Sequence, residues 1–459
     1  MNMMNMRRVL VILFLMACAV RGAFASSRPA PREKLRTIVT TDGEVDDRCS
    51  MARFLLYTNE WEVLGLIHSS SVHHWRGDGD HKPHSWQGTD WLDRQIDQYE
   101  QAFANLRRHD ENYPSPEYLR KQVFVGNVAY PGEMTTPTPG SRRIVEVLLE
   151  DDPRTVWLQA WGGANTIARA LKTIQEEHPD RVEEVSAKAV IYLIALQDDT
   201  YQQYIARHWP GLRVILNEQQ FSAIAYGWRD GIPRPMHSYF NAQWMRANIL
   251  RDHGALCGGY EAHRAAFLSE GDSLAFMHLI DVGLDNTVNP DFGGWGGRFA
   301  RDGKTSALWK DTPDDGDALK PIWRWASAFQ NDWAARADWC VKAPSEANHP
   351  PRVLLTHATR LSVMPGEQVT LDASPSRDGD GHPLSYAWWH YIGAGTYPKA
   401  VSISDANQPR TRLLVPADVQ PGQTIHIICE VTDGGTPPLT RYRRVIVDAA
   451  DRKTGEVAR

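Results

Sequence analysis

Positive charge is not in excess in this sequence: 50 Lys and Arg residues are set against 56 Asp and Glu residues, for a formal net charge of −6. A dedicated DNA- or RNA-binding protein needs a basic surface, so we expect no nucleic-acid partner. Long apolar runs are missing too. The apolar run Val9–Val20 has 12 residues, whereas a transmembrane helix needs roughly 20. We therefore expect no transmembrane span.

Cysteine is scarce, with five residues in a chain of 459, and no two of them form a C-x-x-C motif. This usage suggests neither a zinc site nor a small scaffold held together by disulfides. Four cysteines follow residue 25, namely Cys49, Cys257, Cys340 and Cys429. A Cys257–Cys340 bridge is one option, and buried free thiols are the option that we favour.

The first 25 residues have the layout of a secretory signal peptide. Two arginines precede the apolar segment Val9–Val20, and Ala23–Ala25 forms an A-x-A cleavage site. A lipid anchor at Cys18 is the alternative, because the tetrapeptide that ends there loosely resembles a lipobox. Both interpretations predict a protein that works outside the cytoplasm, in the periplasm or secreted.

Strand-like and helix-like segments alternate between residues 35 and 342. We predict strands at 36–41, 61–67, 155–160, 189–195 and 211–216, and helices at 50–57, 141–150 and 165–177. Such alternation is typical of an α/β domain with a mostly parallel sheet wrapped by helices. In these sheets the functional site lies at the carboxyl ends of the strands.

A second pattern begins after a polar, proline-rich linker at 343–351. Short strand-like runs occur at 368–371, 384–389, 411–415, 424–431 and 442–447. Runs of this length with turn residues between them predict a small all-β sandwich of the immunoglobulin type over residues 352–450. Two of its stretches resemble PKD and cadherin domains.

The most informative stretch is Thr40–Asp47, in which four carboxylates fall within six residues directly after a predicted strand. Carboxylates this close repel one another unless they are solvated, protonated or shared by a cation. Hard oxygen ligands suit Ca²⁺ and disfavour a soft metal. Helix capping is the alternative, because Asp46 and Asp47 precede the predicted helix at 50–57 and can stabilise its N-terminus.

Three stretches resemble the nucleoside hydrolases, and they occur in the same order as in that family. Thr40–Asp47 is similar to the acidic motif D-x-D-x-G-x-D-D, Gly162–Leu171 to a loop–helix segment, and Gly271–Ala275 to the late H-D-P-L-A segment. The runs TTDGEVDDRCSMARFLLYTNE and WLQAWGGANTIARAL look like a narrower family, the Sde182-type exported bacterial proteins. Its members carry a nucleoside-hydrolase-like domain and a β-sandwich, and are usually described as cellulose-binding.

The resemblance implies a Ca²⁺ cofactor and a role for each acidic residue. Asp42 binds the metal and accepts a proton from its water, while Asp47, Asp272 and the backbone carbonyl of Asn165 complete the metal shell. Asp46 holds a sugar hydroxyl. In this chemistry the activated water attacks an anomeric carbon.

Two positions depart from the nucleoside-hydrolase motif, whose first Asp is Thr40 here and whose glycine is Glu44. Three roles are open to Glu44: a metal ligand, a change in the sugar pocket, or a second catalytic acid/base. No residue clearly matches a histidine that would activate a nucleobase. We therefore expect a saccharide, and not a nucleoside, in the site.

Several further residues are candidates for the rim of the site. The predicted substrate-binding residues are Asp46, His73, Trp75, Trp161, Gln197, Asp198 and Trp295. Each has a structural alternative: a plain surface loop, the hydrophobic core, a helix N-cap, or a glycine-rich turn. A polar or aromatic residue in these settings does not need a ligand.

Two functional hypotheses follow. The first is an exported hydrolase of a glycosyl bond, N- or O-linked, with a Ca²⁺-activated water, Asp42 as base and Glu44 as a second catalytic group. The second is a non-catalytic protein that binds cellulose or another plant polysaccharide on the same scaffold. Both predict a carbohydrate ligand, and both leave the oligomeric state open, a homo-oligomer included.

Overall fold

The computed structural model describes residues 33–225, 227–260 and 269–451. The predicted signal peptide and the alternative anchor at Cys18 lie outside these residues. From Leu35 onward the chain forms one compact unit, so the predicted domain boundaries near residues 342 and 352 stay predictions. Within the described ranges, every helix is too short or too polar to span a bilayer.

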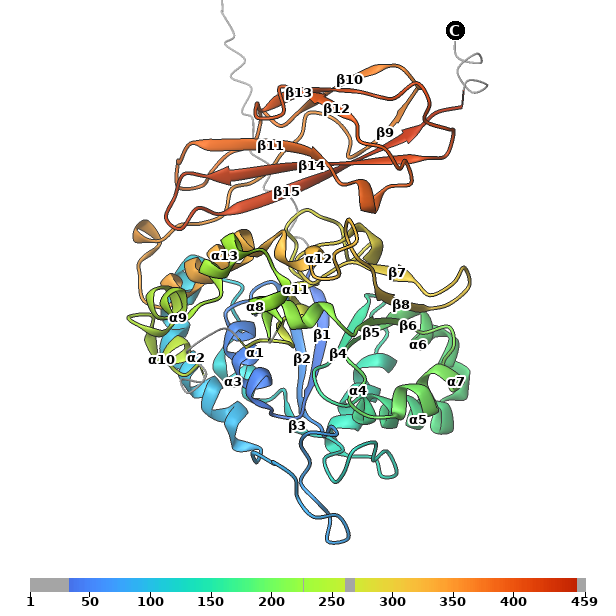
Figure 1. Ribbon diagram of the computed structural model, residues 1–459. Helices are drawn as coiled ribbons and strands as arrows, with labels where there is room; N and C mark the ends of the chain where they lie inside the picture. Colours follow the sequence, from blue (N-terminus) through green and yellow to red (C-terminus); the bar gives the residue numbers. More distant parts are fainter. Residues whose placement is uncertain (1–32, 226, 261–268, 452–459) are drawn as a thin grey trace, which may run out of the picture. The chain divides into compact units, whose positions relative to one another are not determined.

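A sheet of eight strands forms the centre of the α/β region (Figure 1). The strands are β1 (Leu35–Thr41), β2 (Trp61–His68), β3 (Val123–Val125), β4 (Val156–Ala160), β5 (Ala189–Ile194), β6 (Arg213–Asn217), β7 (Phe299–Arg301) and β8 (Leu308–Asp311). Their order is β3-β2-β1-β4-β5-β6-β8-β7. Each neighbouring pair is parallel except β7 and β8. The α/β prediction is confirmed.

Helices cover both faces of this sheet (Figure 1). They are α1 (Val45–Leu55), α2 (Asp90–His109), α3 (Pro116–Arg120), α4 (Pro139–Leu149), α5 (Asn165–Glu177), α6 (Val182–Lys188), α7 (Ala206–His208), α8 (Trp228–Gly231), α9 (Ala242–Met245), α10 (Gly254–Gly258), α11 (Ser273–Met277), α12 (Lys320–Trp323) and α13 (Ala326–Trp339). Side chains alternate along a strand, so Ile38 packs on the α4–α5 side and its neighbour Val39 on the α1–α11 side.

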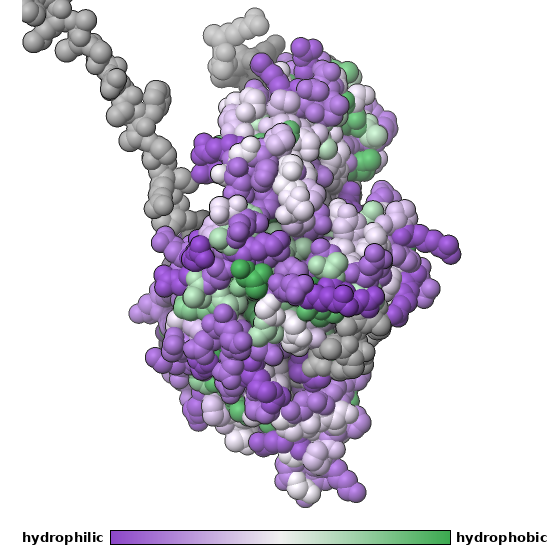
Figure 2. Space-filling view, turned by 90° about the vertical axis from the view of Figure 1, so that its left-hand side faces the viewer, coloured by the Kyte–Doolittle hydropathy of each residue, from purple (hydrophilic) through white to green (hydrophobic). Residues whose placement is uncertain are grey.

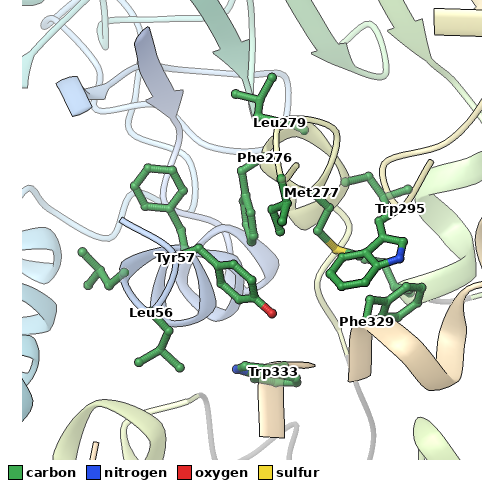
Figure 3. Packing of buried hydrophobic residues seen from close by; sticks show 14 of the residues in the cluster. Leu56, Tyr57, Phe276, Met277, Leu279, Trp295, Phe329 and Trp333 are labelled. Carbon is green, nitrogen blue, oxygen red and sulfur yellow. The ribbon is translucent and has the colours of Figure 1, made fainter. Parts of the chain in front are cut away.

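The core on the α1–α11 side is rich in aromatic residues (Figure 3). Phe276 of α11 lies edge-on to Phe54 of α1 with 5.5 Å between ring centroids. Trp295 lies beside Phe329 of α13, with ring centroids 6.4 Å apart (Figure 3). Large rings that bury their faces stabilise such a core, and they hold α1 and α11 firmly beside the sheet.

Two further sheets form the C-terminal region, with one core between them. Their strands are β9 (Arg360–Val363), β10 (Gln368–Asp372), β11 (Leu384–His390), β12 (Ser402–Ser404), β13 (Arg410–Leu414), β14 (Thr424–Asp433) and β15 (Thr440–Ala449). The orders are β10-β13-β12 and β11-β14-β15-β9. All pairs are antiparallel except β15 and β9, which is consistent with the predicted immunoglobulin-like sandwich.

The sandwich contacts the α/β region through rings and ion pairs. Trp389 of β11 packs against Trp325, with ring centroids 5.7 Å apart. Arg441 of β15 forms an ion pair with the buried Asp332 of α13 at 2.8 Å. The Tyr391 hydroxyl donates a hydrogen bond to Asp314 at 2.8 Å. These contacts explain why the chain from Leu35 forms one compact unit.

Hydrophilic residues cover most of the face shown in Figure 2, and hydrophobic colour occurs there only in small areas. The exposed large hydrophobic residues of the described chain are Val72, Val288, Val341 and Leu414. Scattered single apolar residues are normal on a soluble surface. The polar clusters of the described residues are therefore the candidates for a functional site.

Candidate functional site: a buried acidic cluster

The acidic stretch lies at the carboxyl edge of the sheet, between the end of β1 and the start of α1. β1 is an inner strand, paired with β2 and β4, so this turn sits near the middle of the edge. The helix begins at Val45, earlier than the predicted residue 50, because the chain turns directly into it. Asp46 and Asp47 therefore occupy its first turn. They can stabilise the N-terminus of the helix and also belong to the acidic cluster.

Two glycines allow the chain to pass close to this turn. Gly43 has φ +77°, and a Cβ there would lie 2.9 Å from Trp91 Nε1. Gly162 follows β4, and a Cβ there would lie 2.9 Å from both Cβ and Cγ of Asp42. Only glycine suits such approaches without displacing the neighbour, so the loop after β4 is fitted against the Asp42 side chain.

Three carboxylates from two distant parts of the sequence converge at the start of α1. Asp46, Asp47 and Asp272 each present an oxygen, and these oxygens all lie within 4.8 Å of one another. Asp272 is the N-cap residue of α11, which packs against α1. A Cβ on the preceding Gly271 would lie 3.1 Å from Asp46 Oδ2. The fold therefore brings residue 272 to the acidic stretch.

Burial and mutual repulsion dominate the electrostatics of this group. Burial first, and then the charges of Asp42, Asp272 and Asp46, raise the pKa of Asp47 well above its ordinary value. Burial and the charges of Asp46, Asp42 and Glu44 likewise raise the pKa of Asp272. Thr41 opposes the effect at Asp47 because its hydroxyl donates a hydrogen bond to Oδ1. Such a group needs protons or a cation to be stable.

The donor atoms fit a hard divalent cation. Among the described residues, Asp42 Oδ2 and Asp272 Oδ2 are buried and have no hydrogen-bond partner. Unpaired carboxylate oxygens at such depth cost free energy unless something compensates for them. Calcium takes six to eight oxygen ligands and would compensate for them. Asp42, Asp46, Asp47 and Asp272 are the carboxylates within reach, and the calcium cofactor itself stays a prediction.

A second trio lies beside the first and contains a histidine. Asp42, Glu44 and His74 each present one atom within 4.8 Å of the others. His74 Nδ1 is 4.0 Å from Asp42 Oδ2 and 3.9 Å from Glu44 Oε2. Burial lowers the pKa of His74, and the charges of Asp42 and Glu44 act in the opposite direction.

Sequence reasoning placed the run His73–Trp75 on the rim of the site, and took His73 and Trp75, but not His74, as substrate-binding residues. His73 is exposed, whereas Trp75 stacks on His84 with 4.5 Å between ring centroids. The Ser71 hydroxyl accepts hydrogen bonds from the backbone N–H groups of His73 and His74, at 2.9 and 3.3 Å. This local turn, which strand and helix periodicity does not reveal, decides which ring meets the carboxylates.

The Asn165 side chain is held in a polar network at the start of α5. It accepts a hydrogen bond from Ser69 at 2.8 Å and donates to the carbonyls of Asn127 and Glu133 at 2.9 and 3.0 Å. Its backbone N–H donates to Asp198 at 3.0 Å. The predicted use of its backbone carbonyl as a metal ligand stays a prediction.

Gln197 and Asp198 hold this loop in place. Asp198 is buried, and its oxygens already accept hydrogen bonds from Asn165 N–H and from both the N–H and the hydroxyl of Thr200. Gln197 Nε2 donates to the carbonyls of Trp161 and Ile194. Their polar groups are thus engaged within the protein, which favours the structural alternative over direct contact with a ligand.

Trp161 and Trp295 belong to the core and do not line an open cleft. Trp161 is 0% and Trp295 1% exposed. Trp161 lies against Phe54 and Phe276, and Trp295 against Phe329 and under the Arg441 guanidinium. Neither ring offers a face to a sugar in this structure, so the predicted stacking on a substrate is not supported for these two.

A buried acidic cluster at the carboxyl edge of a parallel sheet, followed by a β-sandwich, defines a nucleoside-hydrolase-like α/β protein with a C-terminal β-domain. Residues 36–299 match the family described as "Cellulose-binding Sde182, nucleoside hydrolase-like domain". Residues 368–449 match "Cellulose-binding protein Sde0182, C-terminal domain". The first match spans more than half of the chain, and the chain belongs to this family.

Solved structures agree with this assignment. A nucleoside hydrolase-related hypothetical protein from Saccharophagus degradans, described as associated with carbohydrate metabolism, is 30% identical with a TM-score of 0.76. The match covers 91% of this chain and all of that one. An inosine-guanosine nucleoside hydrolase is 15% identical over 54% of this chain and 79% of its own, and its TM-score of 0.29 supports no argument. No curated protein sequence matches the chain.

Proposed function

We propose that this protein hydrolyses a glycosyl bond, N- or O-linked, in a carbohydrate, and that the acidic cluster is its active site. The observation that carries the proposal is the convergence of buried aspartates with unpartnered oxygens at the carboxyl edge of a parallel sheet, where α/β proteins place their sites. Membership of a cellulose-binding family supports a carbohydrate as the substrate.

Asp47 and Asp272, with Asp42 or Asp46, would hold a calcium ion. When bound, calcium would supply positive charge that lowers the pKa of a nearby water. Asp42 is buried, with one oxygen unpartnered among the described residues, and its carboxylate would accept the proton of the attacking water. The remaining carboxylates would stabilise positive charge that develops on the sugar ring. Glu44, with 30% of its side chain exposed, would face the substrate.

A non-catalytic carbohydrate-binding protein is the second candidate. Thr40, which replaces the first Asp of the nucleoside-hydrolase motif, is fully buried, and its hydroxyl donates a hydrogen bond to the Gln159 carbonyl at 3.2 Å. A neutral residue that is satisfied within the sheet contributes nothing to water activation. This departure favours a protein that still binds a carbohydrate but no longer hydrolyses it.

One pair of assays separates the two candidates. Purified protein is incubated with calcium and a panel of plant polysaccharides, and released reducing sugar is measured for the wild type, Asp42→Asn and the exposed control Asp93→Asn. We expect product from the wild type and the control, with a loss of at least about 100-fold in Asp42→Asn, typical of a removed general base. Retention on insoluble cellulose without product, unchanged in Asp42→Asn, would establish the binder instead.

A further inference from the structure

The trio of Asp42, Glu44 and His74 is assembled from two separate loops. Asp42 and Glu44 belong to the turn after β1, where the Glu44 N–H donates to Asp42 Oδ1 at 3.2 Å. His74 belongs to the loop after β2. The Ser71 N–H donates to the His74 carbonyl at 2.9 Å, and the Ser71 hydroxyl accepts from the His74 N–H. Both sides of the trio are therefore held by local hydrogen bonds before any ligand arrives.

The separations within this trio are too long for hydrogen bonds and suit the ligands of one metal ion. His74 Nδ1 lies 4.0 Å from Asp42 Oδ2 and 3.9 Å from Glu44 Oε2. Two ligands that are each about 2.1 Å from a tetrahedral zinc ion lie about 3.4 Å apart, so the side chains would have to draw together by about 0.5 Å to hold one. Direct hydrogen bonds would need about 2.7–3.2 Å.

Two of the three atoms are buried and unpaired. His74 Nδ1 and Asp42 Oδ2 are both without a hydrogen-bond partner among the residues that the structure describes. The Asp42 side chain is 0% and the His74 side chain 11% exposed. Buried polar atoms of this kind normally have a partner, and two of them 4.0 Å apart can both bind one ion that lies between them.

The charge of the whole cluster also calls for more than one cation. Asp42, Glu44, Asp46, Asp47 and Asp272 would carry five negative charges when ionised. Arg48, whose positive charge acts on His74, would balance one of them. One divalent ion would balance two more, and a second would balance the remaining two. Asp42 belongs to the trio with His74 and also acts electrostatically on Asp47 and Asp272, so it is the carboxylate that two ions would share. Neighbouring metal ions bridged in this way are common in hydrolases.

We propose that Asp42, Glu44 and His74 form a second metal site, which shares Asp42 with the calcium site and is selective for zinc over calcium. One imidazole nitrogen and two carboxylate oxygens are a zinc ligand set, whereas calcium prefers oxygen alone. Three protein ligands leave a coordination position open, as in zinc sites that bind a water or a substrate. Glu44 and His74 are partly exposed, so this position is accessible from solvent. The proposed zinc site does not depend on whether the protein is a hydrolase.

Metal content of the full-length protein tests the site directly. The metal-free protein is dialysed against zinc in the presence of excess calcium, and bound zinc is measured by elemental analysis. We expect one zinc per chain in the wild type and in His73→Gln, the exposed neighbour of His74. We expect a loss of at least tenfold in zinc affinity in His74→Gln. Cobalt, used as a coloured substitute, should lose its nitrogen-ligand absorption band in the same variant.

Several outcomes decide the matter. Zinc retention by His74→Gln equal to that of the wild type, or a wild type that keeps no zinc under calcium, overturns the proposal. A circular dichroism spectrum that is unchanged in His74→Gln shows that lost zinc is not lost folding. Asp272→Asn separates the two sites, because it should weaken calcium binding and keep zinc. A protein that binds zinc but not calcium would therefore support the zinc site. It would contradict the calcium ion of the proposed function.

Discussion

At the scale of single residues, the site depends on glycine residues as well as on its acidic side chains. Gly162 has no Cβ, and this lets the loop after β4 lie directly against Asp42. Sequence reasoning found Asp42, Asp46 and Asp47 from their spacing, and Asp272 only through a resemblance, because 225 residues separate Asp47 from Asp272. His74 could not be singled out, since the turn made by Ser71 is set by local hydrogen bonds.

Gly162→Ala should disturb the site, because the new methyl group would lie 2.9 Å from two carbons of Asp42. We expect a destabilisation of about 1–3 kcal/mol, typical of overpacking, together with weaker calcium binding. Gly211→Ala is the matched control, because a Cβ there meets nothing within 4 Å. Urea unfolding and calcium titration measure the stability and the calcium affinity of both variants. Equal values in the two variants would refute this account of Gly162.

Asp272→Asn should have opposite effects with and without calcium. Burial and neighbouring negative charges raise the pKa of Asp272, so removing its charge relieves repulsion, and the metal-free variant should melt at or above the wild-type temperature. Calcium should stabilise only the wild type, by about 2.7 kcal/mol at a concentration of 100 times Kd. Differential scanning calorimetry with calcium or chelator measures both effects. A variant that calcium stabilises as much as the wild type would exclude Asp272 as a ligand.

At the scale of elements, α1 and the segment before α11 are joined by a buried ion pair. Arg53 lies on the same helix as Asp46 and Asp47, and its guanidinium donates to Glu270 at 3.1 Å. It also donates to Gln330 and to the Phe329 carbonyl. The alternation of strands and helices predicted α1 with a start five residues late, and it did not predict α11, which has only five residues and so shows no clear period. It could not predict which helices meet, because that follows from packing across the sheet.

Glu270→Gln should destabilise the protein by about 3–5 kcal/mol, because it leaves the fully buried Arg53 charge without its partner. Calcium affinity should fall as well, since Glu270 is two residues from Asp272. Lys399→Ala, which breaks an exposed ion pair with Asp418, should change stability by less than about 1 kcal/mol. Guanidinium unfolding compares the two variants, and similar losses in both would contradict this reading of the buried pair.

At the scale of the whole molecule, acid stability depends on histidines buried without charge. Burial lowers the pKa of His278 to about 3 and of His68 to about 4. The same group in an unfolded chain has a pKa near 6.5, so below that pH the unfolded chain binds protons that the folded chain does not. The contribution of these two histidines to stability should therefore fall as the pH drops from about 6.5 toward 3–4.

His278→Gln should flatten this pH dependence, whereas the exposed control His208→Gln should leave it unchanged. We expect the wild type to lose about 1.4 kcal/mol per pH unit for each such histidine in this range. Urea unfolding at pH 7.5, 5.5 and 4.5 measures the slope. A slope that is the same in His278→Gln and the wild type would show that His278 does not contribute.

The contact between the β-sandwich and the α/β region also limits how the chain can be divided. Trp389 and Tyr391 present their rings to Trp325, and Arg441 neutralises Asp332 inside the other region. A fragment cut at the linker would uncover indole faces on both sides and leave Asp332 with only one of its two arginine counter-ions, Arg336. The C-terminal part is therefore unsuitable as a separate fragment, and experiments that transfer it to another protein should include the α/β region as well.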